Sequence, residues 1–242
     1  KQSSISSEFR VGGGRQERRL AMTAPLLFIT GASSGIGQAM ALEWRRRGGR
    51  LGLVARRGDE MRAWVASQGW SPEQAAVYVA DARDLPAMTA AGRACIDAQG
   101  LPDVVIASAG ISVGVDMSVE ADLDVLRAVL ETNNLGMAAT FQPFIAPMCA
   151  RRSGRLVGIA SVAGIRGLPG HAAYSLSKAG VISFCESLRV ECRPHGVRVV
   201  TIAPGYVDTP LTRGNSYSMP FLMPADKFAR QALDAIAAGV GL

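Results

Sequence analysis

The chain has 242 residues, of which 48% are hydrophobic and 19% are charged, and its 26 Lys and Arg against 20 Asp and Glu give a formal net charge of +6. This composition excludes a disordered chain, and no stretch approaches the roughly 18 consecutive apolar residues of a membrane-spanning helix. The length suits one α/β domain with a large core.

The basic charge is concentrated at the start of the chain. Residues 1–21 are rich in Ser and Gly, carry five basic and two acidic residues, and precede Met22. They lack the apolar core of a signal peptide, so we expect a foreign or disordered leader followed by a single domain over 22–242. A basic arm that binds nucleic acid is the alternative, although the rest of the chain carries no basic or aromatic recognition element; we expect neither a nucleic-acid nor a membrane partner.

The four cysteines, Cys95, Cys149, Cys185 and Cys192, form no CxxC pair, and the chain has only two His. We therefore predict no metal site, and reduced thiols in a cytoplasmic protein. Cys185 and Cys192 are seven residues apart, which places them on one helix face and favours packing.

Strand-like and helical segments alternate in the first half of the chain, and one predicted helix has Ile36, Met40 and Leu42 on its buried face. The predicted strands are 26–30, 50–55, 75–80 and 103–108, and the predicted helices are 35–48, 58–69 and 85–99.

The alternation continues in the second half. Here the predicted helices are 118–131, 133–150, 172–192 and 224–238, and the predicted strands are 155–161 and 197–203. The strands are continuous apolar runs, which indicates a parallel sheet covered by helices on both faces. We therefore predict a doubly wound α/β fold with six strands; a seventh would need more chain after Leu242. Ligands of such sheets bind beyond the carboxyl ends of the strands.

The segment TGASSGIG (30–37) lies between the first strand and the first helix. Gly31 permits a tight turn, Gly35 lets the backbone approach a phosphate, and Gly37 allows close packing of helix and strand. The helix N-terminus then offers N–H groups to a pyrophosphate. The candidate cofactor-binding residues of this loop are Gly31, Ser33, Ser34, Gly35, Ile36 and Gly37.

This G-x3-G-x-G spacing, together with the Tyr-x-x-x-Lys of Tyr174 and Lys178, resembles the short-chain dehydrogenase/reductase family over about residues 25–238. The resemblance implies a Rossmann-type fold, a nicotinamide cofactor and hydride transfer to or from a carbonyl/alcohol substrate.

The second strand ends in Ala55-Arg56-Arg57, without the acidic residue that would bind the ribose hydroxyls of NAD. Two guanidinium groups there can pair with a 2′-phosphate, and the resemblance points to Arg56 as the main contact. We therefore predict NADP(H) rather than NAD(H), with Arg56 and Arg57 as cofactor-binding residues. A solvated pair at a helix start is the alternative, especially for Arg57.

The resemblance implies further cofactor contacts at the ends of later strands. It assigns the adenine amine to Asp81, and it places Ala107-Ser108-Ala109-Gly110 where the family usually has Asn-Asn-Ala-Gly, so side-chain bonds that stabilise the sheet are expected to be lost. The additional predicted cofactor residues are Asp81, Ala82, Ala109, Gly110, Pro204, Gly205, Val207 and Thr209.

Four residues match the family's catalytic tetrad: Asn133, Ser161, Tyr174 and Lys178. Tyr174 and Lys178 are four residues apart on a predicted helix, so they share a face. An ammonium nearby favours the phenolate of a Tyr whose ordinary pKa is about 10, which suits Tyr174 to proton transfer. Ser161 is placed to donate to the substrate oxygen, and by resemblance Lys178 also holds the nicotinamide ribose.

By the same resemblance, Asn133 anchors a water that relays protons to Lys178. Asn134 is adjacent, and Asn133 is chosen because Gly136 then falls in register.

Two further segments bear on the substrate and on self-association. The apolar loop 206–224, with Leu211, Tyr217 and Phe221 among its large side chains, indicates either a greasy substrate or burial against a neighbouring subunit. By resemblance, helices 133–150 and 172–192 pair with a second subunit, which implies a homodimer or homotetramer. The alternative to an enzyme is a dinucleotide sensor without turnover.

Overall fold

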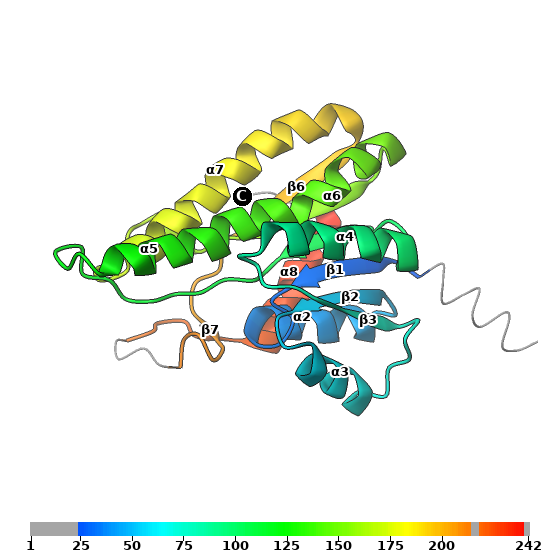
Figure 1. The fold of residues 1–242 in the computed structure, drawn as a ribbon, viewed down its shortest axis with the longest axis horizontal. Coiled ribbons are helices and arrows are strands. Elements are labelled where there is room, and N and C mark those ends of the chain that lie inside the picture. The colour runs from blue at the N-terminus through cyan, green and yellow to red at the C-terminus, as the bar shows by residue number, and fades with distance from the viewer. Residues whose placement is uncertain (1–23, 214–217, 240–242) are drawn as a thin grey trace, which may run out of the picture.

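The computed structural model describes residues 24–213 and 218–239, and its main sheet contains six parallel strands in the order β3-β2-β1-β4-β5-β6 (Figure 1). They are β1 (Leu26–Thr30), β2 (Arg50–Ala55), β3 (Ala75–Val79), β4 (Val104–Ala107), β5 (Gly154–Ile159) and β6 (Val197–Ile202). The predicted doubly wound, Rossmann-type sheet is confirmed, and its strand order reverses between β1 and β4. The predicted leader, 1–21, lies outside the described residues.

Helices cover both faces of the sheet (Figure 1). One layer contains α4 (Leu85–Gln99), α5 (Asp122–Leu130), α6 (Gly136–Arg151) and α7 (Ala172–Cys192). The other contains α2 (Gly35–Arg46), α3 (Gly58–Ser67) and α8 (Ala225–Ala238). Among the described residues, no helix is long and apolar enough to cross a bilayer.

Strand β1 joins the two layers through alternate side chains. Leu26 and Phe28 pack into the layer of α4, α6 and α7, and the Phe28 and Phe144 ring centroids are 4.8 Å apart. Leu27 and Ile29 pack into the layer of α2, α3 and α8. Each such buried side chain contributes about 1.5–3 kcal/mol, so β1 is anchored from both faces and holds the glycine loop that follows it.

The two helices predicted over 118–131 and 133–150 are one continuous run in the structure. A π-helical turn, η1 (Glu131–Leu135), joins α5 to α6 without a break. Within this run the Thr132 hydroxyl donates to the Ala128 carbonyl, one helical turn earlier, at 2.9 Å. Such turns concentrate at functional sites, and this one carries Asn133.

The predicted buried face of α2 is wrong at Leu42, which is 40% exposed, whereas Met40 is fully buried. Two residues along a helix turn the side chain through about 200°, so these two cannot share a face. Glu43 is buried instead, because its carboxylate accepts hydrogen bonds from Arg46 and Arg47.

The expected loop 206–224 contains a small parallel sheet of β7 (Val207–Asp208) and β8 (Met223–Pro224). Strands of two residues have no readable periodicity, so the sequence did not reveal them. Tyr217 of this loop lies outside the described residues. Strand β5 ends at Ile159, two residues earlier than predicted, and Ser161 begins the short 3-10 turn η2 (Val162–Gly164).

Candidate active site

A cleft of about 540 Å³ lies at the carboxyl edge of the sheet, where the strand order reverses. This volume is within the usual range for ligand sites. Ser161, Tyr174 and Lys178 line it, as do most of the predicted cofactor residues: Gly31, Ser33, Ser34, Gly35, Ile36, Gly37, Arg56, Asp81, Ala82, Ala109, Gly110, Pro204, Gly205, Val207 and Thr209. Arg57 and Asn133 are not among the lining residues.

Two glycines of the loop are required by close backbone contacts. Gly31 has φ +67°, and a Cβ there would lie 2.8 Å from the backbone of Ala109. A Cβ on Gly37 would overlap the carbonyl oxygen of Gly31. Side chains at either position would therefore push the loop out of the shape that forms one wall of the cleft.

The N-terminus of α2 opens onto this wall. Its N-cap residue, Ser34, makes no side-chain cap hydrogen bond, and the first turn of α2 contains no acidic residue. The end of the helix carries a partial positive charge and N–H groups without partners inside the helix. Together with Gly35, whose φ is +57°, this end of the cleft fits the pyrophosphate of a dinucleotide.

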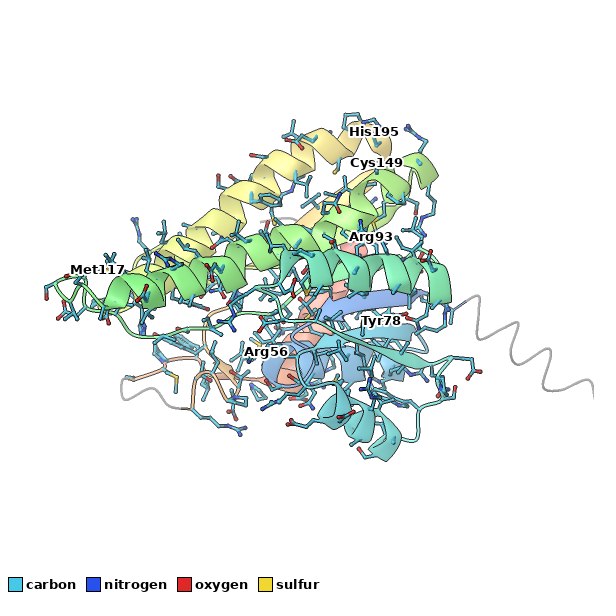
Figure 2. All side chains as sticks on the ribbon, in the orientation of Figure 1. Arg56, Tyr78, Arg93, Met117, Cys149 and His195 are labelled. Carbon is cyan, nitrogen blue, oxygen red and sulfur yellow. The ribbon has the colours of Figure 1, made fainter. Side chains whose placement is uncertain are left out.

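The two predicted phosphate-binding arginines lie in different places. Arg56, which directly follows β2 and is labelled in Figure 2, lines the cleft, and its side chain is 67% exposed. Arg57 pairs with Glu60 at 3.0 Å, at the start of α3. The structure thus brings Arg56 to the cleft and leaves Arg57 as a helix-start ion pair.

Asp81 lies at the end of β3 and is bound by a residue that the sequence analysis missed. Arg83 donates its backbone N–H and its guanidinium to the Asp81 carboxylate. Burial acts to raise the pKa of Asp81, but hydrogen bonds from Arg83 and the nearby charge of Arg56 outweigh it and lower the pKa. No sequence motif singles out Arg83. The only indication in the sequence was that it is a basic residue two positions after Asp81.

The segment Ala107-Ser108-Ala109-Gly110 keeps its position without asparagine side chains. The Thr30 hydroxyl accepts hydrogen bonds from the backbone N–H groups of Ser108 and Ala109, both at 3.2 Å. Bonds that we expected to be lost are thus supplied in part from β1. Thr30 also lines the cleft, and it was missed because it reads as the last residue of a buried strand.

Asn133 is buried behind the cleft. Its Oδ1 accepts from the Ile111 N–H at 2.8 Å, and its Nδ2 donates to the Ile111 carbonyl at 3.0 Å and to Ser177 Oγ at 2.9 Å. The side chain therefore holds the segment after β4 against α7. Asn134 makes a different contact, donating to the Ser177 carbonyl at 2.8 Å.

Ser161, Tyr174 and Lys178 gather at the cleft. Ser161 caps η2 by accepting from the Ala163 N–H at 3.2 Å, and its hydroxyl lies 3.4 Å from the Pro204 carbonyl oxygen. Lys178 Nζ donates to the Ile159 carbonyl at 2.7 Å and lies 5.5 Å from the centroid of the Tyr174 ring. Burial lowers the pKa of Lys178 to about 8.

This arrangement can move a proton at a reacting oxygen. A phenol, a hydroxyl and an ammonium face one cleft, and the ammonium favours the ionised phenol. Among the described residues, no group of three or more His, Cys, Asp or Glu could hold a metal ion.

Comparisons with known proteins agree with this geometry. A family model described as "short chain dehydrogenase" matches residues 26–219. An uncharacterized oxidoreductase of Myxococcus xanthus is 41% identical over 201 residues, covering 81% of this chain and 77% of that protein. An acetoacetyl-CoA reductase of Synechocystis is 35% identical over 195 residues, covering 80% and 76%.

Among solved structures, a variant of actinorhodin polyketide ketoreductase with NADPH superimposes with a TM-score of 0.81 at 27% identity, covering 91% of this chain and 94% of that chain.

Proposed function

The chain belongs to the short-chain dehydrogenase/reductase family, and from that premise we propose that it is an NADP(H)-dependent oxidoreductase acting on a carbonyl/alcohol pair. The observation that carries the proposal is the convergence of Ser161, Tyr174 and Lys178 with the glycine loop on one cleft.

The cleft fits the cofactor in its shape and its donor groups. The uncapped start of α2 would hold the pyrophosphate, Arg56 would hold the 2′-phosphate, and Lys178 would hold the nicotinamide ribose. When bound, the cofactor supplies or accepts the hydride. The absence of an acidic residue at Ala55 supports the preference for NADP(H), since a carboxylate there would repel a phosphate.

The chain's own residues handle the proton. In carbonyl reduction, the Tyr174 hydroxyl donates its proton to the oxygen of the substrate, and the ammonium of Lys178 stabilises the phenolate that remains. The Ser161 hydroxyl donates a hydrogen bond to the same oxygen as its charge develops. Alcohol oxidation uses the same groups in the opposite direction.

A dinucleotide sensor without turnover is the second candidate. It would need the glycine loop and Arg56, but it has no use for a buried ammonium beside a phenol. Burying Lys178 costs free energy, as its lowered pKa shows, and this cost supports the enzyme.

Self-association is part of the proposal. Several large apolar side chains of the helical layer are exposed on α5, η1 and α7: Leu123, Leu135, Leu176 and Phe184. Their exposure supports burial by a second copy in a homodimer or homotetramer, and light scattering would measure the oligomeric state. The four free cysteines favour the cytoplasm.

The test is a panel of ketones, aldehydes and alcohols assayed with both cofactors by nicotinamide absorbance. The proposal expects turnover of at least one carbonyl/alcohol pair and a lower KM for NADP(H) than for NAD(H). A lower KM for NAD(H) would refute the cofactor preference, and cofactor binding without any turnover would favour the sensor.

A further inference from the structure

Asp81 receives three hydrogen bonds from one residue, Arg83. Oδ1 accepts the backbone N–H at 2.9 Å and Nε at 3.4 Å, and Oδ2 accepts Nη2 at 3.2 Å. A carboxylate has about four lone-pair sites for hydrogen bonds. Arg83 therefore leaves about one acceptor site on Asp81, on Oδ2.

Arg56 lies beside that remaining site without occupying it. Its Nη1 is 3.9 Å from Asp81 Oδ2, which is an ion-pair distance but beyond a hydrogen bond. Within the described part of the chain, Arg56 has no second ion-pair partner. Its guanidinium is thus attracted to Asp81 but not bound by it.

We infer that Arg83 is a positioning residue for cofactor selectivity: by pairing with the Asp81 carboxylate and occupying three of its about four acceptor sites, it weakens the attraction of Asp81 for Arg56 and leaves Arg56 available to bind the 2′-phosphate. This inference rests on the proposed NADP(H) preference. Hydrogen bonds to Asp81 raise the pKa of Arg83, and the charge of Glu131 adds to this effect. The charged groups near Asp81 are therefore Arg56 and Arg83, together with Asp84 and Glu131, which line a second pocket with Asp81 and Arg83.

Loss of the Arg83 side chain would leave the Asp81 carboxylate with fewer hydrogen bonds. The backbone N–H bond to Asp81 would remain, but two acceptor sites would open. Arg56 then needs to approach by only about 1 Å to make a charge-assisted hydrogen bond, whose usual length is about 2.7–2.9 Å. That bond would compete directly with the 2′-phosphate for the same guanidinium.

The inference is tested with two cofactor fragments, adenosine 2′,5′-bisphosphate and adenosine 5′-monophosphate, by titration calorimetry. The ratio of their dissociation constants isolates the 2′-phosphate, because both contain adenine. We expect Arg83→Ala to lower the preference for the bisphosphate about tenfold, in line with the strength of one hydrogen bond to a charged group. Arg62→Ala, which removes an exposed arginine paired with Asp59 on α3, should leave the ratio unchanged.

A rescue variant separates positioning from simple attraction by the Arg83 charge. In Asp81→Asn/Arg83→Ala, no carboxylate remains to capture Arg56, so the wild-type ratio should return. A ratio that stays low in the double variant would overturn the inference, as would an unchanged ratio in Arg83→Ala. Arg83→Gln and a thermal melt of each variant control for folding.

The two proposals fail in different ways. Equal affinities of the wild-type protein for the two fragments would remove the NADP(H) preference and, with it, this role of Arg83. A clear wild-type preference that Arg83→Ala does not alter would remove only the role of Arg83.

Discussion

The Nζ of Lys178 lies 5.5 Å from the centroid of the Tyr174 ring, four residues earlier on α7. Lys178 is buried and its amine donates to the Ile159 carbonyl, so β5 and α7 together fix the distance between amine and phenol. A fixed ammonium near a phenol lowers the cost of ionising it. The pair is therefore the part of the cleft on which the proposed proton transfer depends most directly.

Tyr174→Phe should remove the proton donor while keeping the ring. We expect kcat to fall by about 10²- to 10⁴-fold, the usual contribution of a positioned acid or base, with NADPH affinity nearly unchanged by fluorescence titration. Tyr78→Phe is the matched control, because that hydroxyl bonds Gln99 away from the cleft. Near-normal turnover in Tyr174→Phe would exclude the mechanism.

The pH dependence of carbonyl reduction should report Lys178. Because burial lowers its pKa to about 8, the amine is charged below that pH and neutral above it. The charged form stabilises the phenolate that remains after Tyr174 donates its proton, so kcat/KM for reduction should fall as the pH rises through about 8.

Lys178→Met is the control for this titration. It should lower the rate, weaken NADPH binding and abolish the inflection near pH 8. A wild-type profile that stays flat through this range would contradict the assignment.

Arg56 and Arg57 are adjacent in sequence but should differ in effect. Arg56→Ala should weaken NADPH binding by about ten- to a hundredfold, the equivalent of about 1.5–3 kcal/mol for hydrogen bonds to a charged group, and leave NADH binding unchanged. Arg57→Ala should change neither, because its guanidinium pairs with Glu60. An equal loss of affinity for NADPH and NADH in Arg56→Ala would show that Arg56 does not bind the 2′-phosphate.

Gly37→Ala should damage the cofactor site through the backbone. The new Cβ would overlap the Gly31 carbonyl oxygen, and overpacking of this kind costs about 1–3 kcal/mol. We expect NADPH affinity to fall at least about tenfold. Gly167→Ala meets no atom within 4 Å and should bind NADPH normally; unaltered binding by Gly37→Ala would show that the loop relaxes easily.

The main sheet could be predicted because its strands are buried on both faces and therefore stand out as continuous apolar runs. Leu27 and Phe28, for example, point to opposite layers and are both fully buried. The glycine loop was equally readable, since Gly31 and Gly37 are required by backbone contacts that few other residues would permit.

Features that depend on tertiary contacts could not be predicted from the sequence. The π-helical turn at Glu131–Leu135 leaves no periodic signature over five residues. The partners of Asp81 depend on how the segment after β3 folds back, so Arg83 was missed. Arg57 was grouped with Arg56 because adjacency in sequence does not show which side chain faces the cleft.

The buried Asn133 side chain should contribute to the stability of the fold. It is 2% exposed, and it bonds both backbone polar groups of Ile111 as well as Ser177. Asn133→Ala should lower the free energy of unfolding by about 1–3 kcal/mol for each buried group left without a partner, measured by urea denaturation. An unchanged midpoint would mean that water replaces these bonds at no cost.

Asn133→Asp tests whether a negative charge at this position acts on Lys178, although it also loses the Nδ2 donor to the Ile111 carbonyl and to Ser177. The variant keeps the acceptor for the Ile111 N–H. Asn133 Oδ1 and Lys178 Nζ both lie near Gly110, at 3.2 and 3.6 Å from the point where a Cβ on this glycine would stand. The new carboxylate would therefore lie near the Lys178 amine. A nearby opposite charge raises the pKa of a lysine. The inflection in the pH profile of reduction should therefore move above pH 8 in Asn133→Asp, whereas an inflection that stays in place would show that a charge at this position is not coupled to Lys178.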